Sequence, residues 1–366
     1  MGFNCGIVGL PNVGKSTTFN ALTATAAAQA ANFPFCTIEP NVGRVAVPDA
    51  RLNTLAEVGK SQNIVPTQLE FVDIAGLVKG ASKGEGLGNK FLSNIRQVDA
   101  IIHVLRCFED ENITHVENSV DPIRDAEIIE TELMIADMES LERQMDNMTK
   151  KAKSGDKELK AQLEFFAKIR DALNAGLPAR TVEVPDDMQK AVKELFLMTT
   201  KPMLYVCNVM EGDAASGNAM TERVAEMAKK NNTESVIICA EMESQIAQLG
   251  SEEEKKEFLD AMSLEEPGLN KIIRAGYKIL GLQTYFTVGP KEARAWTIHA
   301  GDTAPQAAGV IHTDFEKGFI RAETMAFDDF VKFNGEAGCK ENGKFRQEGK
   351  EYLVKDGDIL NFRFNV

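Results

Sequence analysis

The sequence predicts an α/β protein with a mostly parallel sheet, a helical hairpin inserted into that sheet, and a small α+β domain at the C-terminal end. Three observations support this prediction. Short apolar, β-rich segments alternate with helical stretches, which is typical of a parallel sheet covered on both faces. A long stretch with helical periodicity interrupts the alternation, and strand-like segments with glycine turns follow it. The apolar segments are residues 5–8, 68–72, 100–107, 203–207 and 236–239.

Composition and charge limit the classes of protein to consider. At 366 residues the chain is long enough for two or three domains. Its net charge of −14 argues against a surface that coats nucleic acid throughout, although it is compatible with a local basic patch. The chain has no run of about 18 apolar residues and no N-terminal signal segment, so we expect no membrane association and no secretion. Six cysteines without a C-x-x-C pair support neither a zinc site nor a disulfide framework, and a cytoplasmic location fits best.

The N-terminal segment carries a phosphate-binding loop. An apolar run ends at Val8 and is followed by Gly9, four residues, Gly14-Lys15-Ser16 and a helical stretch. This spacing between strand and helix is the P-loop pattern, in which glycines let backbone N–H groups face a phosphate at the positive end of a helix dipole. Lys15 adds a positive charge for the β- and γ-phosphates, and the Ser16 hydroxyl can ligate Mg²⁺. The sequence therefore predicts binding of a nucleoside triphosphate.

The next segments carry residues expected at the metal ion and the γ-phosphate. The loop at residues 32–37 ends in Thr37, whose hydroxyl is expected to complete the Mg²⁺ shell. A strand then ends in Asp73, which is expected to hold Mg²⁺ through water. Gly76 follows, and its N–H is expected to reach the γ-phosphate as in GTPase switches. The glycine-rich stretch at 80–88 is expected to be a mobile loop that orders when the γ-phosphate is bound.

The residue after Gly76 departs from the pattern of small GTPases. Those proteins carry a glutamine there, which orients the attacking water. This chain carries Leu77, which cannot form that hydrogen bond. We therefore expect either slow hydrolysis that a partner accelerates or a different side chain that positions the water.

A modified base-recognition motif follows the strand at 203–207. Guanine-specific proteins carry Asn-Lys-x-Asp here, and the aspartate accepts hydrogen bonds from guanine N1–H and the exocyclic amine. Val209 replaces the lysine and the longer Glu211 replaces the aspartate, which weakens guanine recognition. Asn208 is retained and can still bond the base, while residues 239–241 (Cys-Ala-Glu) stand where a Ser-Ala-Lys backbone contact is expected. The motif favours adenine.

Residues 125–198 are predicted to form a helical hairpin inserted into the nucleotide domain. The two helices show apolar positions three and four apart, typical of an antiparallel pair. Residues 125–146 hold eight acids against one arginine, whereas residues 149–160 hold five lysines against two acids. The hairpin tip is thus either an RNA or acidic-partner contact or an ordinary solvated surface. The apolar positions are Met134, Met138, Leu141, Met145 and Met148 in the first helix and Leu159, Leu163, Phe166, Ile169 and Leu173 in the second.

The C-terminal part, residues 281–366, is predicted to be a separate α+β domain of ubiquitin-like shape. Its strand-like segments alternate with glycine turns, and residues 326–333 form a predicted short amphipathic helix. Lysines and arginines make its later part basic, with acids interleaved, which is a weak indication of nucleic-acid binding; an ordinary solvated surface is the more common explanation of such a pattern. The remaining residues, 1–280, form the nucleotide domain that the hairpin interrupts. The strand-like segments are 295–298, 319–323, 352–354 and 359–364.

Taken together, these elements resemble the YchF-type subfamily of Obg-like ATPases, within the translation-factor-related class of P-loop GTPases. The resemblance rests on residues 9–16, 73–76 and 208–211, on the helical insertion and on the C-terminal domain. Residues 32–41 and 304–321 also look close to the family. The resemblance implies a Ras-like P-loop NTPase fold with a C-terminal TGS domain. It also implies a preference for ATP over GTP, slow ATP hydrolysis with Mg²⁺, and association with ribosomes.

The resemblance also implies roles for individual residues. Ser16 and Thr37 would ligate Mg²⁺, and Asn208 with the Val209 backbone would read adenine. The family replaces the missing glutamine with a histidine on the loop after the strand at 100–107, which corresponds to His115 here. The fourth loop residue, an asparagine, is similar to that of potassium-stimulated relatives and implies activation by K⁺. The residues expected to hold the phosphates are Asn12, Val13, Gly14, Lys15, Ser16 and Thr17.

The leading interpretation is a monomeric ATPase switch that acts on the ribosome, with Lys15 and His115 in catalysis. A second possibility is a nucleotide-binding scaffold for the ribosome or RNA, in which hydrolysis is incidental and the hairpin and C-terminal domain dock. A third is a conventional GTPase, which Val209 and Glu211 disfavour.

Overall fold

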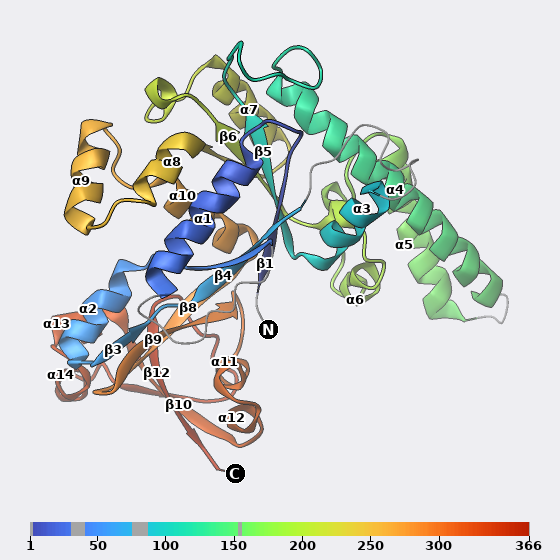
Figure 1. The fold of residues 1–366 in the computed structure, drawn as a ribbon. Coiled ribbons are helices and arrows are strands. Elements are labelled where there is room, and N and C mark those ends of the chain that lie inside the picture. Colours follow the sequence, from blue (N-terminus) through green and yellow to red (C-terminus); the bar gives the residue numbers. More distant parts are fainter. Residues whose placement is uncertain (1–2, 31–40, 75–86, 153–155, 366) are drawn as a thin grey trace. The chain divides into compact units, whose positions relative to one another are not determined.

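The computed structural model describes residues 3–30, 41–74, 87–152 and 156–365, and the chain separates into two compact units (Figure 1). The first unit comprises residues 1–44 and 70–276, and the second comprises residues 45–69 and 277–366. No helix within these described ranges is long and apolar enough to cross a membrane.

The first unit is built around a sheet with the strand order β2-β4-β1-β5-β6-β7. The neighbouring pairs from β4 to β7 are parallel, which confirms the predicted parallel sheet. The pairs Ile7↔Asp73 and Val8↔His103 place the carboxyl ends of β1, β4 and β5 at one edge, where α/β proteins bind ligands. The strands are Asn4–Val8 (β1), Val42–Ala46 (β2), Gln68–Asp73 (β4), Ala100–Arg106 (β5), Met203–Asn208 (β6) and Glu234–Ile238 (β7).

Helices and short 3₁₀ turns connect these strands. β5 and β6 are buried along their whole length, as expected of central strands covered on both faces. The helices are Lys15–Ala30 (α1), Leu87–Gln97 (α3), Ala219–Lys230 (α7), Ala240–Ile246 (α8), Glu252–Ala261 (α9) and Gly268–Ile279 (α10), and the turn Glu211–Asp213 (η3) precedes α7.

The predicted helical hairpin lies between β5 and β6. Helices Pro122–Ala152 (α4) and Lys157–Asn174 (α5) run side by side (Figure 1). Their apolar seam forms one cluster with the chain that leads back to the sheet, which contains Ala179–Thr181 (η1), Gln189–Lys193 (α6) and Met198–Thr200 (η2). The buried members of the cluster are Leu141, Phe165, Phe166, Ile169, Leu173, Ala179, Val192, Leu195 and Leu197.

A buried carboxylate fastens the hairpin to that returning chain. Asp137 of α4 accepts hydrogen bonds from the backbone N–H of Met198 at 2.9 Å and of Thr199 at 2.7 Å, and from the Thr199 hydroxyl at 2.7 Å. Burial raises the pKa of Asp137, and these hydrogen bonds oppose the rise because they stabilise the charged form. The contact holds the middle of α4 against the segment that leads into β6.

The second unit contains a mixed sheet with the order β11-β10-β12-β8-β9-β3. β8–β9 and β10–β12 are antiparallel pairs, whereas β12–β8 and β9–β3 are parallel. The predicted helix at 326–333 is confirmed as α13. The strands are Asn63–Val65 (β3), Leu282–Val288 (β8), Glu292–His299 (β9), Phe319–Ala326 (β10), Arg346–Glu348 (β11) and Asp358–Phe364 (β12), and the helices are Ala50–Gly59 (α2), Ala304–Ile311 (α11), Thr313–Lys317 (α12), Phe327–Lys332 (α13) and Glu336–Glu341 (α14).

The division of the chain differs from the predicted boundary at residue 280, because residues 45–69 pack with the C-terminal unit. Leu55 of α2 is fully buried in a cluster with Phe286 of β8 and Ile359 of β12. Arg51, also on α2, forms an ion pair with Asp356 at 2.7 Å. The C-terminal unit is therefore built from two separate segments of the sequence.

The strand predicted at 352–354 is wrong. Only an isolated bridge between Leu353 and Thr303 forms there. Tyr352 and Lys355 are tied into turns instead, since the Tyr352 N–H donates to Gly349 O and the Lys355 N–H to the Asp358 carboxylate. The segment between these turns is too short for a ladder.

Candidate nucleotide-binding site

The phosphate loop lies between β1 and α1, as the sequence predicts. Asn12 and Gly14 have positive φ angles of 62° and 94°, so the loop curls tightly before α1 begins at Lys15. A side chain at Gly14 would also collide with the Asn208 amide. The glycine is therefore required both by the backbone conformation and by the space.

Two of the predicted catalytic and metal-site residues meet at this loop. The Lys15 ammonium forms an ion pair with the Asp73 carboxylate, because β4 ends beside β1. Ser16 and Thr17 are exposed in the first turn of α1, whereas Val13 is buried and packs in the core. Thr37 and Gly76 lie outside the described residues, as do Leu77 and most of the loop at 80–88.

The oxygen donors at this edge fit a magnesium ion that is bound together with phosphates. The described residues contain no group of three or more His, Cys, Asp or Glu side chains able to hold a metal. Mg²⁺ generally takes only one or two protein oxygens and completes its shell with water and phosphate oxygens. The Ser16 hydroxyl and the Asp73 carboxylate supply donors of that kind.

Asn208 connects the phosphate loop to the loop after β7. Its Nδ2 donates to Val13 O at 3.0 Å, and its Oδ1 accepts from the Ala240 N–H at 3.0 Å. The neighbouring Val209 is 2% exposed, and its N–H donates to Ile238 O at 2.9 Å. The structure thus gives Asn208 and the Val209 N–H partners inside the protein, and it leaves Glu211 exposed beyond them.

His115 is buried, and both of its ring nitrogens have partners. Its Nε2 lies 2.8 Å from Asp125 Oδ2, and its Nδ1 accepts from the Glu117 N–H at 3.2 Å. These partners select the tautomer with the proton on Nε2, facing the aspartate. Arg124 also contacts Asp125, at 2.9 Å from its other oxygen. The His115 ring is therefore held by the first turn of α4.

The loop that carries His115 nevertheless touches the phosphate loop. Asn12 Nδ2 donates to Thr114 O at 3.1 Å. The buried Arg106 guanidinium shapes this loop from inside by donating to three carbonyl oxygens, those of Phe108 (3.0 Å), Asp110 (3.1 Å) and Ile113 (2.9 Å).

Sequence reasoning missed Arg106 and Asp125. The available signals were weak. Arg106 is a charged residue at the end of a mostly apolar strand, and Asp125 is an acid in the first turn of a helix. Neither signal identifies a partner, because the contacts depend on how the loop folds back.

Comparisons with known proteins agree with this geometry. Residues 4–140 match the MMR_HSR1 family, described as 50S ribosome-binding GTPase. Residues 282–365 match the YchF-GTPase_C family, described as a protein of unknown function (DUF933). The chain is 58% identical over 367 residues to the "Ribosome-binding ATPase YchF" of Haemophilus influenzae, with all of both chains covered. The chain belongs to the YchF family.

Other members of the YchF family give the same result. The protein of the same name from Bacillus subtilis is 55% identical over 368 residues, again with complete coverage of both chains. The solved structure of the Schizosaccharomyces pombe YchF GTPase superposes with a TM-score of 0.89 at 39% identity, covering 99% of this chain and 97% of that one. The two-unit YchF fold described above is therefore shared with a solved relative.

Proposed function

We propose that this chain is a ribosome-associated ATPase that binds and slowly hydrolyses ATP with Mg²⁺ and acts as a nucleotide-dependent switch. The observation that carries the proposal is the P-loop, with Lys15 beside Asp73 at the carboxyl edge of the sheet. The bacterial relatives, identical at 55% or more over their whole length, are named ribosome-binding ATPases. The exposed base-side residue Glu211, in place of the usual aspartate, supports adenine over guanine.

The ion pair between Lys15 and Asp73 suggests how the loop responds to nucleotide. Phosphates of ATP offer Lys15 a stronger partner, and its move to them frees the Asp73 carboxylate for the metal shell. Ser16 and Thr37 would supply the remaining protein oxygens, and Gly76 would contact the γ-phosphate. Mg²⁺ would neutralise the charge that develops on the phosphates.

His115 is proposed to position the attacking water in place of the missing glutamine. In this structure its ring bonds to Asp125, so this role requires the ring to leave the aspartate. The contact between Asn12 and Thr114 supports the proposal, because it already holds the histidine loop against the phosphate loop.

Replacement of His115 tests this role. His115→Ala should slow ATP turnover about 100-fold, the low end of what a positioned acid–base side chain contributes, while ATP affinity stays nearly unchanged. The matched control is His312→Ala, which removes an exposed histidine from the second unit. An unchanged turnover rate removes His115 from the mechanism.

The base preference needs its own measurement, because the fission yeast relative is titled a GTPase and the bacterial relatives are named ATPases. Calorimetric titration with ATP and with GTP, both with Mg²⁺, decides between them. We expect tighter binding of ATP. Equal or tighter binding of GTP would overturn the adenine assignment.

Potassium activation is the remaining proposal at this site. Asn12 stands exposed at the fourth loop position, where its side-chain oxygen can face a monovalent ion beside the phosphates. Turnover should be faster in KCl than in NaCl at equal ionic strength, and Asn12→Ala should remove the difference. Equal rates in both salts would contradict the proposal.

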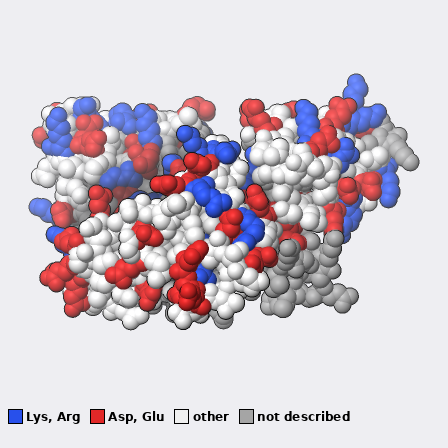
Figure 2. Space-filling model, turned by 90° about the horizontal axis from the view of Figure 1, so that it is seen from above, with Lys and Arg blue, Asp and Glu red and all other residues white. Residues whose placement is uncertain are grey.

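The ribosome is the proposed partner, and the hairpin tip is a candidate RNA contact. Lys150, Lys151, Lys157 and Lys160 are exposed near that tip. Figure 2 shows basic side chains at that end of the molecule, with acidic ones among them. We further propose a monomer that works in the cytoplasm.

The scaffold alternative is separable by experiment. Lys15→Ala should abolish phosphate binding and, if the chain is a switch, should change how much of it co-sediments with ribosomes in the presence of ATP. If the amount that co-sediments is the same with and without the substitution, and with and without nucleotide, the scaffold is favoured.

A further inference from the structure

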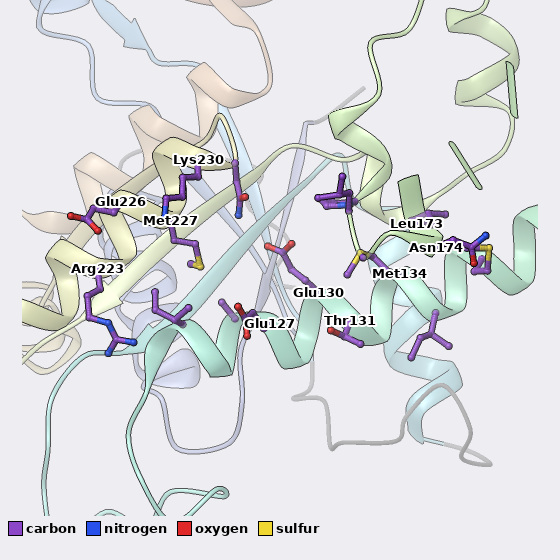
Figure 3. Close-up of a pocket in the computed structure, with 18 of the residues that line it drawn as sticks. Glu127, Glu130, Thr131, Met134, Leu173, Asn174, Arg223, Glu226, Met227 and Lys230 are labelled. Atoms are coloured by element: carbon purple, nitrogen blue, oxygen red, sulfur yellow. The ribbon is translucent and has the colours of Figure 1, made fainter. Parts of the chain in front are cut away.

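A large groove lies in the first unit, away from the phosphate loop. Its volume is about 910 Å³, and it is lined by α4, by α7 and by the end of α5 with the chain that follows (Figure 3). Such a volume lies in the range of functional binding sites in proteins. The groove plays no part in the nucleotide chemistry described above.

The floor of the groove is apolar. Met134 and Met138 of α4 line it together with Met227 of α7. Ile135 and Leu177 also line it, and they are 36% and 50% exposed. Large apolar side chains that remain exposed in a concave surface mark interaction sites, and methionines adapt their shape to a partner. The floor is therefore suited to the apolar face of another element.

The rim of the groove is acidic. Glu127, Glu139 and Glu226 are exposed, and the described residues provide none of them with an ion-pair partner. Of the rim cations, Arg223 is already paired with Asp121 at 3.1 Å, which leaves Lys230. A rim with this charge repels a phosphate backbone and attracts basic side chains.

One buried polar side chain, Glu130, lines the groove near the sheet and is hydrogen-bonded inside the protein. Glu130 accepts a hydrogen bond from the Arg180 guanidinium at 3.1 Å and another from the Tyr205 hydroxyl of β6. Asn231 in turn donates to that hydroxyl at 3.3 Å. These contacts pair the Glu130 carboxylate inside the protein, so the carboxylates of the groove that have no ion-pair partner among the described residues lie at its edge.

The length of the groove along α4 suits an α-helix. Lining residues recur on α4 from Ile123 to Glu139, a span of about 24 Å at 1.5 Å per residue. A helix of about 16 residues has the same length. A ribosome consists of RNA and protein, and the acidic rim argues against RNA at this surface.

We propose that this groove binds a basic amphipathic helix of a ribosomal protein. The apolar stripe of that helix packs on the three methionines, and its lysines and arginines face Glu127, Glu139 and Glu226. The inference rests on the ribosome binding proposed above, and it names the protein component as the partner of this surface.

Site-specific photo-crosslinking tests the partner class. The photoreactive residue p-benzoylphenylalanine replaces Ile135 or Met227 in the full chain, which is irradiated with purified 70S ribosomes. The control places the same residue at Glu257, which is exposed on α9 outside the groove. We expect adducts only from the groove positions. They should resist ribonuclease, and mass spectrometry should assign them to a helix with an apolar stripe and basic flanks.

The other outcomes overturn the proposal. An adduct to RNA shows that the acidic rim does not select protein. Co-sedimentation without a groove-specific adduct assigns the ribosome contact to another surface, while the proposed function stands. Failure of the unmodified chain to co-sediment under any nucleotide condition overturns both proposals.

Charge reversal supplies an independent test. The triple variant Glu127→Lys, Glu139→Lys and Glu226→Lys should weaken ribosome binding about tenfold, since several exposed ion pairs are lost together. The matched control Glu164→Lys, Glu253→Lys and Glu257→Lys changes net charge equally at exposed sites elsewhere. The control should bind unchanged or more tightly, because added positive charge attracts ribosomal RNA. Unchanged ATP affinity in both variants shows that the fold is intact, and equal ribosome binding by the two variants would contradict the groove proposal.

Discussion

Asn208→Ala separates two roles for the side-chain amide at the end of β6: shaping the phosphate loop or reading the base. The side chain is 5% exposed, and it bonds to Val13 O and to the Ala240 N–H, both at 3.0 Å. Its removal leaves these two backbone groups without their partners in a buried place. Each lost neutral hydrogen bond costs about 1 kcal/mol, and each unsatisfied buried group about 1–3 kcal/mol. With two such groups, we expect the free energy of unfolding to fall by about 2–6 kcal/mol.

The same substitution should weaken ligand binding without regard to the base. If about 2 kcal/mol of the lost free energy had served to order the phosphate loop, the dissociation constant of a bound nucleotide rises about 30-fold. The loop holds phosphates, so ATP, GTP and inorganic tripolyphosphate should lose affinity by the same factor. Calorimetric titration of the three ligands with Mg²⁺ measures this.

A second asparagine provides the control. Asn218 caps α7, and its Nδ2 donates to Cys107 O at 2.9 Å. Asn218→Ala should cost about 1 kcal/mol of stability without changing affinity for the three ligands. A loss in Asn208→Ala that is confined to ATP, with tripolyphosphate bound as tightly as before, would refute the structural role and return Asn208 to base recognition.

Two further predictions concern stability. Burial lowers the pKa of His103 from 6.5 to about 3. As the pH falls, the imidazole is therefore protonated in the unfolded chain at a higher pH than in the folded chain. The free energy of unfolding should then drop by about 2 kcal/mol between pH 8 and pH 5, and urea titrations should show a flatter profile for His103→Leu. An equal slope in both proteins would contradict this. Leu55→Ala should cost about 2–5 kcal/mol because Leu55 is fully buried in the second unit. The exchange rates of backbone amide hydrogens should then rise more in β8 and β12 than in β1 and β5. A larger rise in β1 and β5 would place α2 in the nucleotide unit.

Much of the fold was predictable because local patterns determine it. The P-loop spacing requires a strand, a tight turn and a helix, and the positive φ of Gly14 confirms the backbone need that the glycine indicates. The apolar β-rich segments became neighbouring parallel strands, since buried strands of that composition have few other arrangements. The apolar positions three and four apart in the insertion predicted two helices, and they form the buried seam between α4 and α5.

The unit boundaries were less predictable because they depend on distant contacts. The apolar positions of α2 are consistent with either core, and nothing in residues 45–69 indicates that Leu55 packs against Phe286. The segment at 352–354 shows the opposite limit: its composition suits a strand, yet the turns on either side decide its conformation.

At the site, too, local sequence patterns predict which residues are present, whereas distant contacts decide where their side chains point. Sequence patterns selected Lys15 and Asp73 for separate roles, and the structure brings them together because the register between adjacent parallel strands places their ends side by side. His115 lies on a loop, where register gives no such constraint. Its orientation follows from Asp125, which the turn at the start of α4 places within 2.8 Å of the ring. A motif can therefore identify the chemical groups at this edge of the sheet, but the direction in which a loop side chain points depends on partners that the motif does not contain.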